Sequence, residues 1–155
     1  PEKFAKIIVE SAKEYSNDVQ TISAVDLDKV NDLVSKLDEF AKLIFSSTQR
    51  DIQKLKEKIR KTQSFAIGSY RDLYHFAKLI YEDNSISQDL RNKAKEIMDA
   101  LNKYIVHEFS NNKYKNAYGV SIELPSYGNI APEYKNTQFA KDTSWDEMLE
   151  KLNKT

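Results

Sequence analysis

Few residues in this sequence could carry nucleophilic or acid–base chemistry. Nucleophilic catalysis needs a thiol or hydroxyl beside a general base, yet the 155 residues contain no cysteine and only two histidines, His75 and His107. The Gly-x-Ser-x-Gly motif of serine hydrolases is also absent. His75 adjoins the apolar residues of a helical pattern, and His107 lies in a β-branched, aromatic run. We therefore predict structural or solvent-facing roles for both histidines and no catalytic residue in this sequence.

The motif Asp26-Leu-Asp28 raises the question of metal binding, because hard cations take carboxylate oxygens. Two carboxylates are too few for a dedicated site, since Ca²⁺ takes about six to eight oxygen ligands. Both positions also suit a helix N-terminus, where an acidic side chain caps free backbone N–H groups. We predict capping here, and no metal or cofactor site in this sequence.

One basic run, residues 54–61, holds five positive charges that Glu57 alone offsets. A local phosphate-binding face is therefore one hypothesis. Against it, Leu55 and Ile59 stand at helical spacing, and Glu57 and Lys61 form a favourable i,i+4 pair. A solvated helix face is the interpretation that we favour.

Tyrosines gather in the C-terminal third of the chain, at Tyr104, Tyr114, Tyr118, Tyr127 and Tyr134. Tyrosine is amphipathic and common at interfaces, so these residues could line a surface for a sugar or a peptide. The alternative is that the rings pack and the hydroxyls face water. The loop 111–116, which contains Tyr114, is where we first expect contact with a partner chain.

Composition indicates one globular domain over residues 1–155. Lysine plus arginine equals aspartate plus glutamate at 24 each, so no overall field favours nucleic acid or an anionic membrane. No apolar run reaches the roughly 20 residues that a membrane span requires, and no signal peptide precedes the first amphipathic pattern. Because the sequence starts at Pro1 within that pattern, we expect a processed or excised piece of a longer protein.

Apolar residues recur at helical spacing through most of the chain, and only three glycines interrupt it. We expect a first helix at about 2–16, with its apolar stripe at Phe4, Ile7, Ile8, Ala12 and Tyr15. A central core helix is predicted from Val30 to Ile44, and a peripheral, charged helix at 49–63 capped by Thr48. Two further helices are expected after Asp72 and after Ser85 or Ser87.

Short β patterns complete the chain. The segment Thr21–Val25 is rich in β-branched residues and predicts one short strand. Two further β patterns, 104–109 and 118–124, predict a β-hairpin over about 104–124. After a turn, a docking helix is expected at about 144–153, opened by a capping box of Ser144 and Glu147.

Three stretches, in the same order along the chain, resemble segments of the clostripain family of cysteine peptidases. They are Thr21–Val30, Tyr70–Leu79, and the C-terminal run Gly119–Pro125 that is followed by Tyr134 and by Phe139–Leu149. The resemblance implies a C-terminal, non-catalytic helical part that supports a caspase-like α/β catalytic domain on polypeptide outside this sequence. In the family the catalytic histidine and cysteine precede the segment that resembles Thr21–Val30, so neither histidine here can take that place.

The resemblance also implies a parent endopeptidase that cleaves proteins or peptides after arginine or lysine. The partner of this chain would be the upstream catalytic domain or chain of the same precursor. A bacterial secreted or cell-surface setting would follow, and calcium is left open as a cofactor of the parent. The alternative hypothesis is a free-standing helical protein-interaction or surface-binding module without enzymatic activity.

The fold class that we predict is therefore mainly α with a small β component (α+β). It comprises a helical bundle, the hairpin and one short strand, with the strands pairing with each other or extending the sheet of the catalytic domain. Short strands leave unpaired edges unless something covers them. We therefore also expect an exposed apolar patch larger than the few hundred Å² usual on monomers.

Overall fold

The computed structural model describes residues 2–15, 19–128 and 130–154 of the chain. These residues form seven α-helices and two antiparallel sheets of two strands each, which confirms the mainly α fold with a small β component. The elements in chain order are α1 (Glu2–Tyr15), β1 (Thr21–Val25), α2 (Val30–Ile44), α3 (Gln49–Lys61), β2 (Tyr70–Asp72), α4 (Leu73–Tyr81), α5 (Gln88–Tyr104), β3 (Ile105–Ser110), β4 (Ser121–Glu123), α6 (Gln138–Asp142) and α7 (Trp145–Lys154). None of these helices combines the length and the hydropathy that crossing a bilayer would require.

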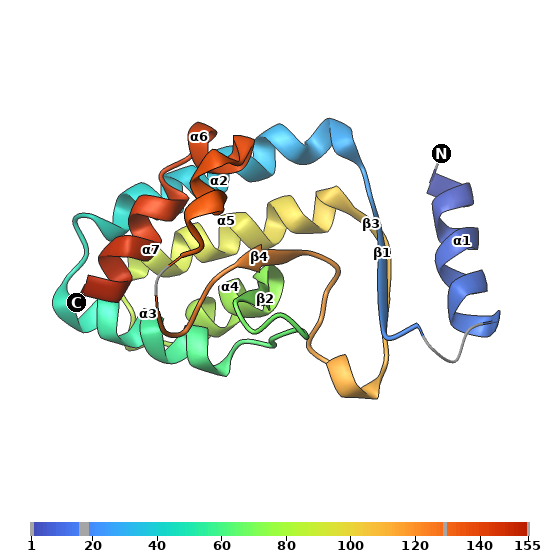
Figure 1. Ribbon diagram of the computed structural model, residues 1–155, viewed down its shortest axis with the longest axis horizontal. Coiled ribbons are helices and arrows are strands. Elements are labelled where there is room, and N and C mark those ends of the chain that lie inside the picture. The colour runs from blue at the N-terminus through green and yellow to red at the C-terminus, as the bar shows by residue number, and fades with distance from the viewer. Residues whose placement is uncertain (1, 16–18, 129, 155) are drawn as a thin grey trace.

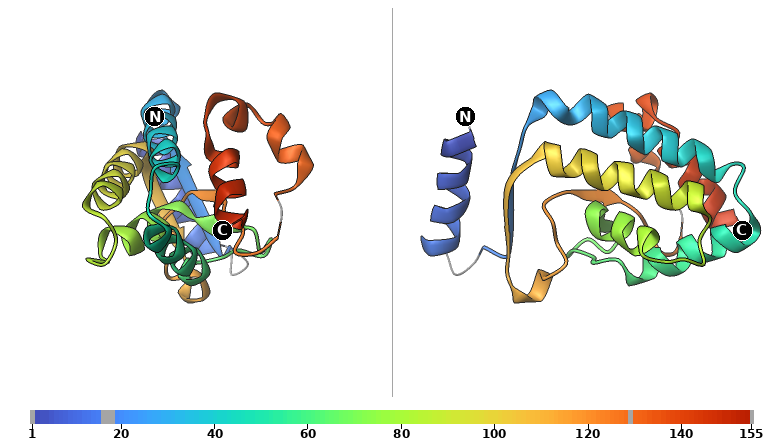
Figure 2. Two further views of the ribbon diagram at one scale, coloured as in Figure 1. Left: turned by 90° about the vertical axis from the view of Figure 1, so that its left-hand side faces the viewer. Right: turned by 180° about the vertical axis from the view of Figure 1, so that it is seen from behind.

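The elements form three layers along the long axis of the molecule (Figure 1). Helix α1 stands at one end, against the sheet of β1 and β3. The other helices lie on the opposite side of that sheet, with α2 and α5 running side by side (Figure 2). The small β2–β4 sheet lies within this helical bundle.

The bundle owes its core to apolar stripes at helical spacing. Helix α2 buries Leu33, Leu37, Phe40, Ala41 and Ile44, as its sequence pattern predicts. The ring of Phe40 meets the ring of Phe76 from α4 edge-on, with the centroids 6.1 Å apart, a favoured aromatic geometry. Helix α7 packs on α2, and its Trp145 is fully buried. The C-terminal helix therefore docks on the bundle of its own chain.

Side-chain caps define several helix starts. Asp72 accepts the N–H of His75 at the start of α4, and Thr48 accepts the N–H of Asp51 in α3, as predicted. The prediction of a capping box formed by Ser144 and Glu147 is wrong. The N–H of Ser144 donates instead to Asp38 of α2, at 2.9 Å.

The predicted hairpin over 104–124 is also wrong. Strand β3 pairs with β1, in the register Thr21↔Ser110, and β4 pairs with β2. The sequence pattern of 70–72, directly before α4, did not reveal β2 as a strand. After β3 the chain passes over one face of the β1–β3 sheet, where the carbonyl of Gly119 accepts the hydroxyl of Ser23, and β4 then pairs with β2.

Gly119 makes this crossing possible. Its carbonyl oxygen accepts the hydroxyl of Ser23 in β1 at 2.6 Å. Its φ of 106° is a conformation that glycine adopts readily and other residues rarely do. A Cβ at this position would lie 3.1 Å from the Cβ of Ser23 and 3.3 Å from the Cβ of Glu108. The close approach of backbone to sheet therefore requires a glycine.

Candidate functional site

Both histidines hold contacts between elements. Nδ1 of His75, a partly buried residue of α4, accepts the N–H of Gln63 at 2.9 Å. Burial, together with the nearby charge of Lys78, lowers the pKa of His75. His107 of β3 lies 2.7 Å from a carboxylate oxygen of Glu10 in α1, and this contact lowers the pKa of Glu10. No nucleophilic thiol accompanies either ring, since the sequence has no cysteine.

The two charged motifs also have local partners. Asp26 accepts the N–H of Asp28 at 3.0 Å and caps a short 3₁₀ turn at Leu27–Lys29. In the basic run, Lys54 pairs with Glu57 and Lys58 pairs with Asp83. The described part of the chain holds no group of three or more histidine, aspartate or glutamate side chains that could bind a metal ion.

The tyrosines divide between the core and the surface. Tyr114 is buried and its ring stacks on Phe65, with centroids 5.6 Å apart. Tyr114 thus packs its ring inside the chain, whereas contact of the loop 111–116 with a partner chain stays a prediction. Tyr118 packs against Tyr74, whereas Tyr127 is largely exposed.

The β1–β3 sheet has two open edges. Each of its strands pairs only with the other among the described residues. The N–H of Asn111 donates to the carbonyl of Gln20 at 2.9 Å, so even-numbered residues of β1 exchange hydrogen bonds with β3. In an antiparallel pair the intervening residues then direct their backbone groups outward. The N–H and C=O groups of Thr21 and Ser23 thus form an unpaired edge, a ready template for another strand.

This sheet is nevertheless covered on both faces. On one face, α1 contacts β3 through Glu10 and His107, and Lys13 lies over the ring of Phe109. On the other face, Ser23 bonds to Gly119 and Ile105 packs against the bundle core. The middle layer of this three-layer arrangement has only two strands, too few for independent stability in isolation.

Helix α1 exposes a second apolar face. The predicted stripe is not the buried face of the helix: Val9, which the stripe omits, is 1% exposed, whereas Phe4 is 73% exposed. Ile7 and Ile8 are exposed as well. At 100° per residue, Val9 lies about 140° around the helix from Phe4, so the two point in different directions. We call Phe4, Ile7 and Ile8 the outer face of α1.

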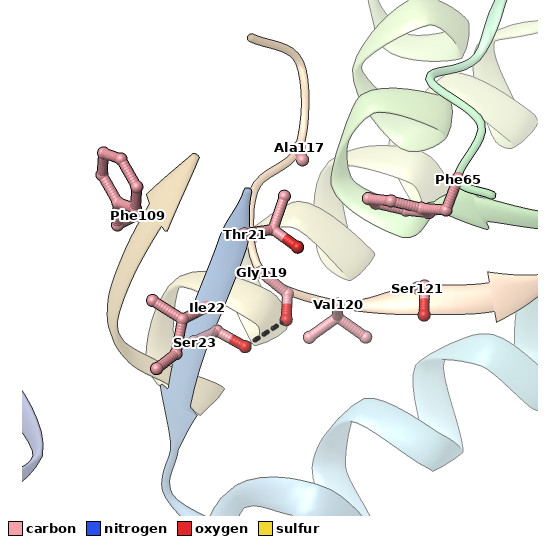
Figure 3. Close-up of a pocket in the computed structure, with 9 residues that line it drawn as sticks. All are labelled: Thr21, Ile22, Ser23, Phe65, Phe109, Ala117, Gly119, Val120 and Ser121. Atoms are coloured by element: carbon pink, nitrogen blue, oxygen red, sulfur yellow. Dashed lines mark hydrogen bonds between the residues drawn. The ribbon is translucent and has the colours of Figure 1, made fainter. Parts of the chain in front are cut away.

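A cavity of about 200 Å³ adjoins the β1 edge. Figure 3 shows it between β1, Phe65 and the segment from Ala117 to Ser121. None of its lining residues is an acid, a base or a thiol. The cavity could therefore accommodate a side chain, but it holds no acid–base or thiol group for catalysis. Sequence reasoning predicted the strand and expected unpaired strand edges, but it could not say which edge of β1 stays unpaired, because no residue type marks an unpaired backbone.

The described residues thus define a mainly helical α+β unit with two open sheet edges and an exposed apolar helix face. The chain belongs to the clostripain family of cysteine peptidases: the family model described as the clostripain family matches residues 1–152. This finding confirms the resemblance that the three sequence stretches indicate. No curated protein and no solved structure matches the chain.

Proposed function

We propose that this chain is the C-terminal, non-catalytic part of a clostripain-like cysteine endopeptidase and extends the sheet of its catalytic domain. The observation that carries the proposal is a two-stranded sheet that the described residues cover on both faces and leave open at both edges. Helices on both faces of one sheet are typical of α/β domains, whose sheets have more strands than this. Docking would supply the missing strands.

The catalytic thiolate and histidine would then lie on polypeptide outside this sequence, which has no cysteine. The parent protein would cleave after arginine or lysine, as the family resemblance implies. We also propose that the parent is a bacterial protein that is secreted or lies at the cell surface. The role of the present chain would be mechanical: the helical bundle of α2, α4 and α5 would support β1 and β3, and these two strands would enlarge the catalytic sheet.

Docking at the β1 edge explains three features together. A neighbouring strand would pair the outward N–H and C=O groups of Thr21 and Ser23. One of its side chains would enter the cavity next to that edge. The helical layer that accompanies the added strand would cover the outer face of α1, where Phe4 is now mostly in solvent.

Two proline variants test the proposal. Thr21→Pro removes an outward N–H of β1, and Ser110→Pro removes the matching N–H at the other edge, because these residues face each other in the register. Each chain is mixed with the separately produced catalytic part, and association is measured by sedimentation together with amidase activity on arginine and lysine substrates. We expect wild type and Ser110→Pro to associate, and Thr21→Pro to associate at least tenfold more weakly.

Wild-type chain that remains monomeric, with no effect on the catalytic part, would instead support the free-standing interaction module. Loss of association in Ser110→Pro alone would move docking to the β3 edge. The present chain on its own is expected to have no amidase activity. Circular dichroism of each variant verifies that the bundle remains folded.

A further inference from the structure

A second cavity lies away from the open sheet, between α2 and β4. Its volume is about 250 Å³. Its walls are mostly apolar and include Val30, Leu33, Val34, Leu37, Val120 and Ile122. We call it the α2–β4 cleft. The volume suits one long side chain rather than a helix or a strand.

One end of the α2–β4 cleft is acidic. Glu123 lines it, is 6% exposed, and its carboxylate has no hydrogen bond or ion pair within the described chain. The alternation of residues 120–124 predicts this side chain in solvent, so its burial is a finding of the tertiary structure. A buried carboxylate without a partner is unfavourable, and Glu123 is one of the residues that line this cavity.

A second buried carboxylate, that of Asp146, acts with Glu123 on the cleft residue Tyr134. The indole N–H of Trp145 donates to the backbone oxygen of Glu123 at 2.9 Å, and Asp146 is the next residue in the chain. Asp146 is 7% exposed, and its Oδ1 atom is fully buried without a hydrogen-bond partner. Lys135, which is near in sequence to the cleft residue Tyr134, pairs with Glu150 instead.

Tyrosines complete the acidic end. Tyr70 is the cross-strand neighbour of Glu123 and therefore lies on the same face of the β2–β4 sheet. Tyr134 lines the same cleft. Burial, followed by the charges of Glu123 and Asp146, raises the pKa of Tyr134 strongly. Both carboxylates therefore act on a residue that lines the cleft, although Asp146 itself is not one of the lining residues.

We propose that the α2–β4 cleft binds an arginine side chain from a neighbouring polypeptide. The aliphatic stem would lie along the apolar wall of α2, as long basic side chains do on apolar surfaces. The guanidinium would meet Glu123 and Asp146 and stack on the rings of Tyr70 and Tyr134. The proposed function enters only in identifying the source, which would be the catalytic part of the same protein.

A guanidinium fits this end better than a metal ion does. Two carboxylates supply at most four oxygens, fewer than the six to eight that Ca²⁺ takes. The remaining walls are apolar, and aromatic rings favour a planar organic cation. The small number of oxygen ligands and the apolar and aromatic walls therefore indicate arginine rather than a divalent cation.

Trp145 provides a direct readout. It is the only tryptophan in the sequence, it is fully buried, and it bonds to Glu123. The full chain is titrated with N-acetylarginine amide while tryptophan fluorescence and the indole N–H resonance are followed. N-acetylcitrulline amide, which is nearly isosteric but neutral, is the matched control ligand. We expect saturable binding of the arginine compound and at least tenfold weaker binding of the citrulline compound.

Variants assign the effect to the cleft. Glu123→Gln and Asp146→Asn should each weaken binding of the arginine compound about tenfold, as expected for the loss of one charged hydrogen-bond partner. Glu150→Gln, which alters an exposed carboxylate paired with Lys135, should leave binding unchanged. Equal binding of both compounds, a response to CaCl₂ alone, or no saturable response up to the solubility of the probe would each overturn the inference.

The source of the arginine is tested separately, by association with the catalytic part. If wild type associates and Glu123→Gln associates equally well, the cleft does not hold an arginine of that partner, although the proposed function stands. If the arginine compound binds but no association occurs, the proposed function fails and the guanidinium site stands. The two results are therefore distinguishable.

Discussion

Replacing Gly119 by alanine tests the crossing of the 117–121 segment over the β1–β3 sheet. Two costs are expected. The φ of 106° disfavours any residue with a Cβ, by about 1–2 kcal/mol. The new Cβ would lie 3.1 Å from the Cβ of Ser23 and 3.3 Å from the Cβ of Glu108, and crowding of this kind costs roughly 1–3 kcal/mol. We therefore expect the free energy of unfolding to fall by about 2–5 kcal/mol.

The other two glycines separate these costs. Gly128 has a φ of 83° but open space around its Cα, so Gly128→Ala should show the backbone cost alone, about 1–2 kcal/mol. Gly68 has neither a positive φ nor a close neighbour, and Gly68→Ala should change stability by under about 1 kcal/mol. Urea unfolding followed by Trp145 fluorescence measures all three. If Gly119→Ala is no more destabilising than Gly128→Ala, the segment does not press on the sheet and the reasoning fails.

Three further predictions concern buried charge, capping and the outer face of α1. Burial raises the pKa of Asp72 to about 6, so the folded state holds this proton more tightly than the unfolded state. Stability should therefore fall as pH rises from about 4 to 6, by about 2–3 kcal/mol, and urea unfolding of Asp72→Asn should lack this slope. Asp38→Ala should lower the free energy of unfolding by about 1 kcal/mol, because Asp38 accepts the N–H of Ser144. Glu147→Ala should lower it by less than about 0.5 kcal/mol. Equal losses in the two variants would contradict the assignment of Asp38 as the cap. Phe4→Ser should leave unfolding within about 0.5 kcal/mol of wild type yet weaken association with the catalytic part, whereas Val9→Ala should lower stability by about 1–3 kcal/mol; the reverse order would place Phe4 in the core.

Local patterns predicted the helices well. The spacing of the apolar residues in α2 identified the buried face, and Thr48 and Asp72 marked the starts of α3 and α4. These successes share a cause. Helical periodicity and side-chain caps join residues three or four positions apart, so the interacting partners are visible within one short stretch.

Long-range pairings were not predictable in the same way. Alternation identified β-like segments, but it could not tell that Ile105–Ser110 pairs with Thr21–Val25 rather than with the following strand. Likewise, Ser144 is capped by Asp38, 106 residues away. Each of these contacts competes with local alternatives of similar chemistry, and only the packing of the whole bundle decides between them.

By itself, the sequence determined the mainly helical class, the helix faces and the family resemblance, because these depend on residue type and short spacing. Only the tertiary structure decided which strands pair, that both edges of the β1–β3 sheet stay open among the described residues, and that Glu123 is buried at a cleft. The physical reason is that backbone pairing and the burial of a charge depend on which distant segments the folded chain brings together. No residue carries that information alone.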